Sequence, residues 1–163
     1  MHVLFITMYN LALTNSRNIY ADLMNLFKQE GHDVYVMCPY ERRTEKKTQL
    51  LKRDGIHFLG VRTLNLQKTN VVEKGIGQLS LESLFKRAYR KYLSDIKFDI
   101  ILYSTPPITF TKAIRHIRKK NPRAMTYLLL KDIFPQNAVD LGMLSTRGLK
   151  GFLYRKFRNK EKE

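Results

Sequence analysis

The sequence predicts an α/β domain with a doubly wound parallel sheet of about five or more strands. Short apolar runs of strand length alternate with segments whose apolar residues recur at helical spacing. The composition, with 44% hydrophobic residues in a chain of 163, is that of one globular domain with a core. The sequence contains no internal repeat and no low-complexity linker, so we treat residues 1–163 as one domain.

The first predicted unit is a strand, a helix and a second strand. Val3–Thr7 is an apolar run typical of a buried strand, and Asn15 or Ser16 can cap the helix that follows. The apolar residues of this helix share one face: Ile19, Leu23, Leu26 and Phe27. Gly31 ends the helix, and Val34–Cys38 is the second strand. Such a unit implies parallel neighbouring strands joined by a right-handed crossover.

Charged residues dominate the next part of the chain. Pro39–Asp54 is strongly charged and has a weak apolar side, which predicts a surface helix that ends at Gly55. Ile56–Val61 is the third predicted strand. Arg62–Gln78 is polar and has no clean period, so we expect a long functional or mobile loop there.

The second half continues the alternation of helices and strands. Leu79–Ile96 carries an apolar and aromatic stripe at helical spacing, and Asp99–Tyr103 is the fourth predicted strand. Ile108–Lys120 is the next helix, Ala124–Leu130 is the fifth strand, and a last helix starts at Gly148. Five strands alternating with five helices predict a Rossmann-like sheet with the strand order 3-2-1-4-5.

We expect a ligand-binding crevice at the carboxyl edge of this sheet, where the strand order reverses between the first and fourth strands. The loop 8–16, which contains Asn15 and Ser16, would face this crevice together with Ser104 and Thr105 after the fourth strand. Lys131-Asp132 would lie beside them. Asp132 follows a strand and precedes a turn, so it can also be read as the cap of the next segment.

Net charge is the unusual feature of the composition. Thirty Lys and Arg against fourteen Asp and Glu give +16, which predicts attraction to nucleic acid, anionic lipid or a phosphorylated substrate without choosing among them. The candidate membrane contact on the predicted helix 79–96 consists of Phe85, Lys86, Arg87, Tyr89, Arg90, Lys91 and Tyr92. Phe152–Lys156 is a second candidate. In the alternative reading, the aromatic side chains belong to the core and the cations form a solvated face.

Several classes of site have no signal in the sequence. The glycine pattern of dinucleotide-binding loops, the Walker A pattern and the nucleophile elbow are missing, and the four histidines show no metal-ligand spacing. We therefore expect no cofactor and no metal. The single cysteine, Cys38, excludes an intramolecular disulfide, fits a reducing cytoplasm and is predicted to be a small buried hydrophobe. Met1–Ile6 does not have the pattern of a signal peptide, and no apolar run is long enough to span a membrane.

Three segments together resemble the N-terminal half of family 4 glycosyltransferases, in particular the bacterial enzymes of capsule, O-antigen and exopolysaccharide assembly. They are Gly31-His32-Asp33-Val34, Ser104-Thr105-Pro106-Pro107, and Lys131-Asp132-Ile133-Phe134-Pro135-Gln136-Asn137-Ala138. The first segment is common among related folds, whereas the other two are much more specific in combination. Two departures are the loop 11–16, which lacks the glycine pair of many relatives, and Lys131, which stands where many relatives have histidine.

The resemblance implies the GT-B architecture, in which two Rossmann-like domains face a cleft. Residues 1–163 would be the acceptor-side domain, and the donor-binding domain that holds the nucleotide-sugar would be absent. The implied reaction is sugar transfer with retention, with Asp132 as polar anchor or base for the acceptor hydroxyl. The implied acceptor is a saccharide, often linked to polyprenyl diphosphate, so the enzyme would sit peripherally on the cytoplasmic face of the membrane. The isolated domain would be inactive.

Two other hypotheses remain open. The chain could be a basic Rossmann-like binding module without catalysis, although it has no recognised nucleic-acid motif and we expect no nucleic-acid partner. It could also be a non-catalytic subunit that recruits a separate donor-binding chain to the membrane.

Overall fold

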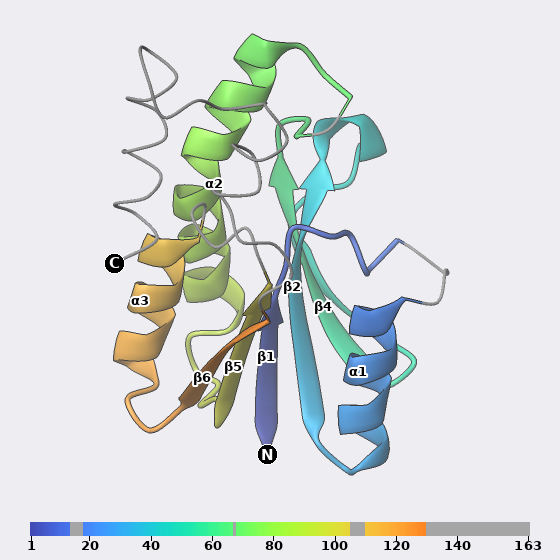
Figure 1. The fold of residues 1–163 in the computed structure, drawn as a ribbon, viewed down its shortest axis with the longest axis vertical. Coiled ribbons are helices and arrows are strands. Elements are labelled where there is room, and N and C mark those ends of the chain that lie inside the picture. Colours follow the sequence, from blue (N-terminus) through green and yellow to red (C-terminus); the bar gives the residue numbers. More distant parts are fainter. Residues whose placement is uncertain (14–17, 67, 105–109, 130–163) are drawn as a thin grey trace, which may run out of the picture.

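The computed structural model describes residues 1–13, 18–66, 68–104 and 110–129, and side chains 71, 72, 74 and 75 are outside this description. Within these ranges the chain forms one six-stranded sheet with three α-helices (Figure 1). The elements, in chain order, are β1 (His2–Ile6), α1 (Ile19–Gln29), β2 (Asp33–Glu41), the 3-10 turn η1 (Arg42–Thr44), β3 (Gln49–Arg53), β4 (Ile56–Thr63), α2 (Val71–Tyr92), β5 (Ile100–Ser104), α3 (Thr111–Lys120) and β6 (Met125–Leu129).

The strand order across the sheet is β3-β4-β2-β1-β5-β6. All neighbours are parallel except β3 and β4, which pair antiparallel. The five strands predicted from apolar runs are confirmed in the predicted order, with the reversal between β1 and β5. The carboxyl ends of five strands therefore meet at one edge of the sheet. This mixed α/β arrangement is compatible with a Rossmann-like fold.

The surface helix predicted for Pro39–Asp54 is wrong. β2 continues to Glu41, and β3 then pairs with β4, from Gln49 opposite Gly60 to Arg53 opposite Ile56. Asp54 and Gly55 connect the two strands, and both have positive φ, 50° and 80°. An Asp-Gly pair with positive φ is the turn that a two-residue hairpin requires. The backbone hydrogen bonds that β3 makes to β4 therefore favour a strand over the helix that the weak apolar period of this charged segment predicted.

The long loop predicted for Arg62–Gln78 is also wrong over much of its length, because α2 begins at Val71. Asn70 caps the helix, since its side-chain oxygen accepts a hydrogen bond of 2.7 Å from the backbone N–H of Glu73. Gly77 lies within the helix, and a Cβ there would come within 3.0 Å of the Leu66 side chain. Close packing against Leu66 therefore explains the glycine at position 77. This glycine makes the helical period of the segment hard to recognise in the sequence.

Alternate residues of β1 belong to two hydrophobic clusters. Leu4 and Ile6 pack in a cluster to which α2 and α3 contribute, whereas Val3 and Phe5 pack in the cluster that contains Met24 of α1. Figure 1 shows α1 on one side of the sheet and α2 with α3 on the other. The helix predicted from Gly148 lies outside the described residues, so the doubly wound arrangement as a whole stays a prediction. Cys38 is fully buried, as predicted.

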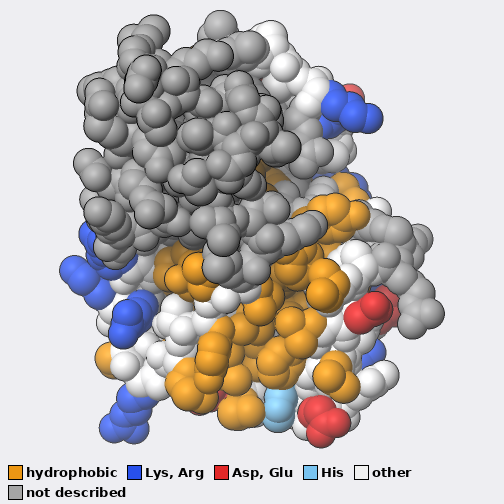
Figure 2. All heavy atoms as spheres, viewed as in Figure 1, with side chains coloured by type: hydrophobic (Ala, Val, Ile, Leu, Met, Phe, Trp, Pro, Cys, Tyr) orange, Lys and Arg blue, Asp and Glu red, His pale blue; other side chains and the backbone are white. Residues whose placement is uncertain are grey.

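Strand β6 presents hydrophobic side chains to solvent. Met125, Tyr127 and Leu128 are large and exposed, and Figure 2 shows hydrophobic side chains gathered on the face of the molecule that is seen there. Among the described helices, none combines the length and the apolar character that a membrane crossing requires.

Candidate functional site

Two described cavities lie at the carboxyl edge of the sheet, on either side of η1. The first, which we call the β1–β2 pocket, measures about 230 Å³ and is lined by Met8, Tyr9, Asn10, Pro39, Glu41, Arg43 and Thr44. The second, which we call the α2 pocket, measures about 430 Å³ and is lined by Arg42, Leu64, Asn70, Glu73 and Ile76. Ligands of open α/β sheets bind outside the carboxyl ends of the strands, so this edge is the candidate site.

The β1–β2 pocket combines an aromatic ring with several kinds of hydrogen-bonding group. Tyr9 is 41% exposed, and its backbone N–H donates to Thr7 Oγ1 over 3.0 Å. Asn10 Oδ1 accepts from the backbone N–H of Leu13 at 3.2 Å. On the opposite wall, the guanidinium of Arg43 is paired with the carboxylate of Glu41. A small cavity with these groups could hold a polar ring-shaped ligand, such as a sugar.

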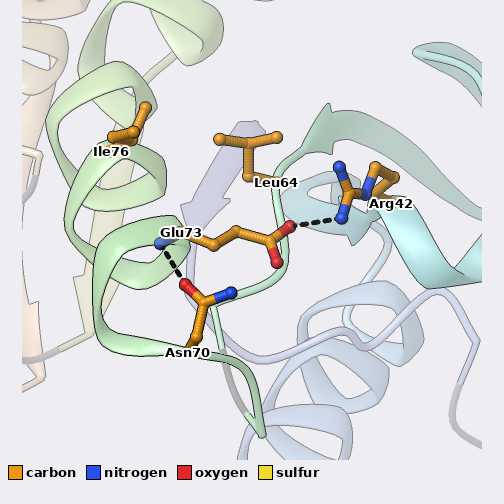
Figure 3. A pocket seen from close by; sticks show the side chains of 5 residues that line it. All are labelled: Arg42, Leu64, Asn70, Glu73 and Ile76. Atoms are coloured by element: carbon orange, nitrogen blue, oxygen red, sulfur yellow. Dashed lines mark hydrogen bonds and ion pairs between the residues drawn. The ribbon is translucent and has the colours of Figure 1, made fainter.

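The α2 pocket is organised by the carboxylate of Glu73, whose side chain is 14% exposed (Figure 3). Glu73 Oε1 accepts from the backbone N–H and from Nδ2 of Asn65, both at 3.2 Å, and lies 3.0 Å from Arg42 Nη2. Glu73 Oε2 accepts from Thr69 Oγ1 at 2.6 Å. The hydrogen bond from Thr69, the bonds from Asn65 and the charge of Arg42 together lower the pKa of Glu73 against the opposing effect of burial.

Asn65 connects the two pockets. Its Nδ2 donates to Glu73, and its Oδ1 accepts from the backbone N–H of Arg43 at 3.0 Å. The η1 turn, which carries Arg42 into one pocket and Arg43 into the other, is therefore tied to the first turn of α2. A change at Glu73 should be felt on both sides of η1.

Ser104 lies at the predicted reversal point, at the carboxyl end of β5. It is 2% exposed, and its hydroxyl donates to Thr7 Oγ1 of the chain just after β1 over 3.1 Å. The hydroxyl thus links β1 to β5 and is not presented to solvent. Five other predicted site residues lie outside the described residues: Asn15, Ser16, Thr105, Lys131 and Asp132. Their convergence on this edge stays a prediction.

The predicted membrane contact on α2 needs a correction. Phe85 and Tyr89 are fully buried in the core, where Phe85 packs on Phe110 with 4.8 Å between ring centroids and the Tyr89 hydroxyl accepts from Asn121 Nδ2 at 2.9 Å. Their helical spacing belongs to the face that packs on the sheet, so their assignment to a surface contact was wrong. Phe152–Lys156 lies outside the described residues.

The cations beside these aromatics do reach the surface. Lys86 is partly exposed, and the exposed basic residues of α2 and α3 are Arg87, Arg90, Lys91, Lys112, Arg115, Arg118, Lys119 and Lys120. Figure 2 shows Lys and Arg side chains on the α3 side of the molecule. Burial, together with the charges of Lys86, Arg90, Lys120 and Lys119, lowers the pKa of His116. We call Lys86 and the exposed basic residues of α2 and α3 named above the α2–α3 basic surface.

Sequence reasoning missed the residues that build the two pockets. Asn70 and Glu73 have the spacing of a helix cap followed three residues later by an acid, which is a helix-start signal. That signal predicts the cap. It gives no indication that Glu73 would pair with Arg42, because the two residues are brought together only when the sheet folds. Tyr9 and Asn10 lie within the loop that was predicted to face the crevice.

No group of three or more His, Cys, Asp or Glu that could hold a metal ion occurs among the described residues. Comparison of the sequence with protein-family models finds no match, and comparison with curated proteins finds none either. The function must therefore be argued from the site itself.

Proposed function

We propose that this chain is the acceptor-side domain of a retaining glycosyltransferase with two Rossmann-like lobes, in which its doubly wound sheet forms one wall of the cleft. The β1–β2 pocket is the observation that carries the proposal. It opens at the carboxyl ends of β1 and β2 and offers an exposed ring, an amide, a carboxylate and a hydroxyl. This set of groups suits a ligand that has an apolar ring face and several hydroxyls.

The role of this domain is to bind and orient the acceptor. Tyr9 would contact the apolar face of a sugar ring, and Asn10 would contact a hydroxyl at its rim. The Thr44 hydroxyl, which donates to the Glu41 carbonyl at 2.8 Å, would accept a hydrogen bond there. Fixing the acceptor hydroxyl converts a bimolecular encounter into an oriented reaction. Asp132 would anchor or deprotonate that hydroxyl, and the nucleotide-sugar would be held mainly by the other lobe.

The α2–α3 basic surface supports a peripheral position on an anionic membrane, where such an enzyme would meet a lipid-linked acceptor. Each cation near an anionic bilayer contributes roughly 1 kcal/mol of attraction. Phe85 and Tyr89 are buried, so the membrane contact that the described residues of α2 and α3 can make is electrostatic. Raising the salt concentration should therefore release the domain from vesicles.

Saccharide binding by the chain tests the proposal. In an NMR titration with a panel of methyl glycosides, we expect shifts of the backbone amides of Tyr9, Asn10 and Thr44. Tyr9→Ala should weaken binding about tenfold or more, which corresponds to 1.4 kcal/mol. Tyr127→Ala is the matched control, because Tyr127 is similarly exposed but lies on β6. Equal losses in the two variants, or an absence of saccharide binding, would count against the proposal.

The same basic surface favours a second candidate, a non-catalytic binding module for a polyanion. Co-sedimentation with anionic vesicles and a gel-shift assay with duplex DNA, each over a salt series, separate the two. The glycosyltransferase hypothesis expects binding to vesicles without comparable binding to DNA. Tight, strongly salt-dependent binding to DNA would favour the second candidate.

A further inference from the structure

We propose that the α2 pocket binds a small organic anion, whose carboxylate or phosphate group contacts Arg42 and whose apolar body contacts Leu64 and Ile76. This site is separate from the β1–β2 pocket, and η1 lies between them. The inference does not require sugar transfer, because it rests on the apolar lining of the open α2 pocket and on the accessible guanidinium of Arg42.

The shape of the pocket suits a ligand with an apolar part. Its volume of about 430 Å³ falls within the range of small-molecule sites, roughly 300–1,000 Å³. Leu64 follows β4, and Ile76 lies on α2 and is 54% exposed. In the view of Figure 3, Ile76 and Leu64 lie above the Glu73 side chain, and Leu64 is between Ile76 and Arg42. An exposed isoleucine that faces a hollow gains from a ligand that covers it.

The hydrogen-bonding groups of Glu73 and Arg42 favour a ligand whose polar group accepts hydrogen bonds. A carboxylate offers about four acceptor positions, and Glu73 already receives the two N–H groups of Asn65, the Thr69 hydroxyl and the Arg42 guanidinium. Three of these contacts are on Oε1 and one is on Oε2, so most of the accepting capacity of Glu73 is used within the protein. Arg42, in contrast, has five N–H donors, and its described ion pair with Glu73 engages one nitrogen.

Arg42 is also held in place before any ligand arrives. Its side chain is 56% exposed, which leaves the guanidinium accessible, while the contact with Glu73 fixes one end of it. A planar guanidinium fits the paired oxygens of a carboxylate or a phosphate better than a lysine ammonium does. The negative charge of Glu73 opposes a bound anion, whereas the net charge of +16 attracts one. The ligand should thus need both its anionic group and its apolar body to bind.

Four probes separate these contributions in an NMR titration of the full chain. Phenyl phosphate and benzoate carry an anionic group on an apolar ring, benzyl alcohol lacks the charge, and inorganic phosphate lacks the ring. We expect phenyl phosphate or benzoate to bind more tightly than the other two and to shift the amides of Leu64, Glu73 and Ile76. The relative affinity of the two anions then indicates whether the natural ligand carries a phosphate or a carboxylate.

Variants of Arg42 complete the test. Arg42→Gln should weaken phenyl phosphate binding about tenfold or more, because charge-assisted hydrogen bonds are lost. Arg42→Lys should give an intermediate loss, because the charge remains and the planar fork does not. Arg123→Gln is the control, since it removes the same charge from an exposed position between α3 and β6 and should change binding less than about twofold.

Three outcomes would overturn the proposal: equal losses in Arg42→Gln and Arg123→Gln, equal binding of benzyl alcohol and phenyl phosphate, or shifts confined to the α2–α3 basic surface. Thermal unfolding of each variant shows whether it is folded. If the Arg42→Gln variant does not fold, the Arg42→Lys variant takes its place in the comparison with Arg123→Gln. Saccharide binding in the β1–β2 pocket is measured with different probes and at different amides. Failure of one proposal can therefore be distinguished from failure of the other.

Discussion

The two edges of the sheet use polar residues in different ways. At the amino edge, polar groups satisfy backbone atoms: the backbone N–H of His2 donates to Asp99, and Asn121 Oδ1 accepts from the backbone N–H of Phe98 at 2.8 Å. At the carboxyl edge, polar side chains also accept from backbone N–H groups, as Glu73 does from Asn65, but the Glu73 network in addition borders a cavity. Polar residues alone therefore do not mark a site, whereas polar residues arranged around unfilled space do. Substitutions at the amino edge should change stability without changing binding, whereas substitutions at the carboxyl edge should change binding.

Phe98→Ala should give the largest effect on stability. Phe98 is 3% exposed and packs edge-on against Tyr35 with 5.4 Å between ring centroids. Removing a buried phenyl ring typically costs about 3–5 kcal/mol of unfolding free energy, which urea denaturation measures. Leu128→Ala, at an exposed position of β6, should cost far less. If phenyl phosphate or saccharide binding fell together with stability in a Phe98→Ala protein that is still folded, the separation of the two edges would not hold.

Asn121→Ala should have the next largest effect. Asn121 is buried, accepts from the Phe98 N–H, and donates from Nδ2 to the Tyr89 hydroxyl at 2.9 Å and to the Ile117 carbonyl at 2.8 Å. Its removal leaves the buried Phe98 N–H without this partner, which costs about 1–3 kcal/mol. Tyr89→Phe removes only one of these contacts and should cost less than Asn121→Ala. Equal losses in the two variants would mean that the bond to Phe98 contributes nothing.

The difference between the edges also explains what the sequence could predict. Four of the five apolar strands were predictable because a buried parallel strand is apolar over its whole length. The fifth, β6, has the same kind of apolar run although most of its side chains are exposed. Strand β3 was not predictable, because an edge strand with partly exposed Leu50 and Leu51 has no such run. The Asp54-Gly55 pair was a hairpin signal that the charge of the segment obscured. Similarly, Gly77 obscured the start of α2.

The edge of the sheet that carries the described pockets was predictable, but their place along it and their composition were not. The reversal of strand order predicted a crevice between β1 and β5, which stays a prediction, whereas the described pockets lie beside β1 and β2 and beside β4 and α2. Arg42, Asn65 and Glu73 could not be grouped from sequence, because their contacts join the ends of β2 and β4 to α2. Phe85 and Tyr89 show the opposite error, since their aromatic character suggested a surface contact while their spacing suited the core.

Acid should have a smaller effect on stability, in a different pH range for each edge. The two ranges follow from the pKa shifts of Glu73, at the carboxyl edge, and His57, near the amino edge. Glu73 has a pKa below its ordinary value of about 4.3 because Thr69 and Asn65 donate to its carboxylate and Arg42 lies beside it. The unfolded chain therefore binds this proton more readily than the folded chain. The resulting stabilisation is present above the ordinary pKa and is lost as the pH falls through the lower folded value.

His57, near the amino edge, responds in a different pH range. Burial and the charge of Lys52 lower its pKa, against an opposing effect of Asp33, so folding favours the neutral ring. Its stabilisation is present above the ordinary histidine pKa of about 6.5 and is lost as the pH falls from there towards the lower folded value. His116 has a pKa shifted in the same direction, so His57 accounts for only part of this loss.

Urea denaturation over a pH series should resolve the two contributions. His57→Phe, which keeps a ring to stack on Tyr35 at a centroid distance of 4.5 Å in the native protein, should reduce the loss of stability that begins below about pH 6.5. Glu73→Gln should leave that loss unchanged and reduce only the loss below about pH 4.3. Protonation of Glu73 releases Arg42 and also removes the negative charge that opposes a bound anion, so phenyl phosphate binding by the folded native protein should change in that lower range. A change in benzoate binding near pH 6.5 instead would connect the α2 pocket to the histidines and contradict the separation of the two edges. Phenyl phosphate does not serve for this comparison, because a phosphate monoester itself takes up a proton at about pH 6.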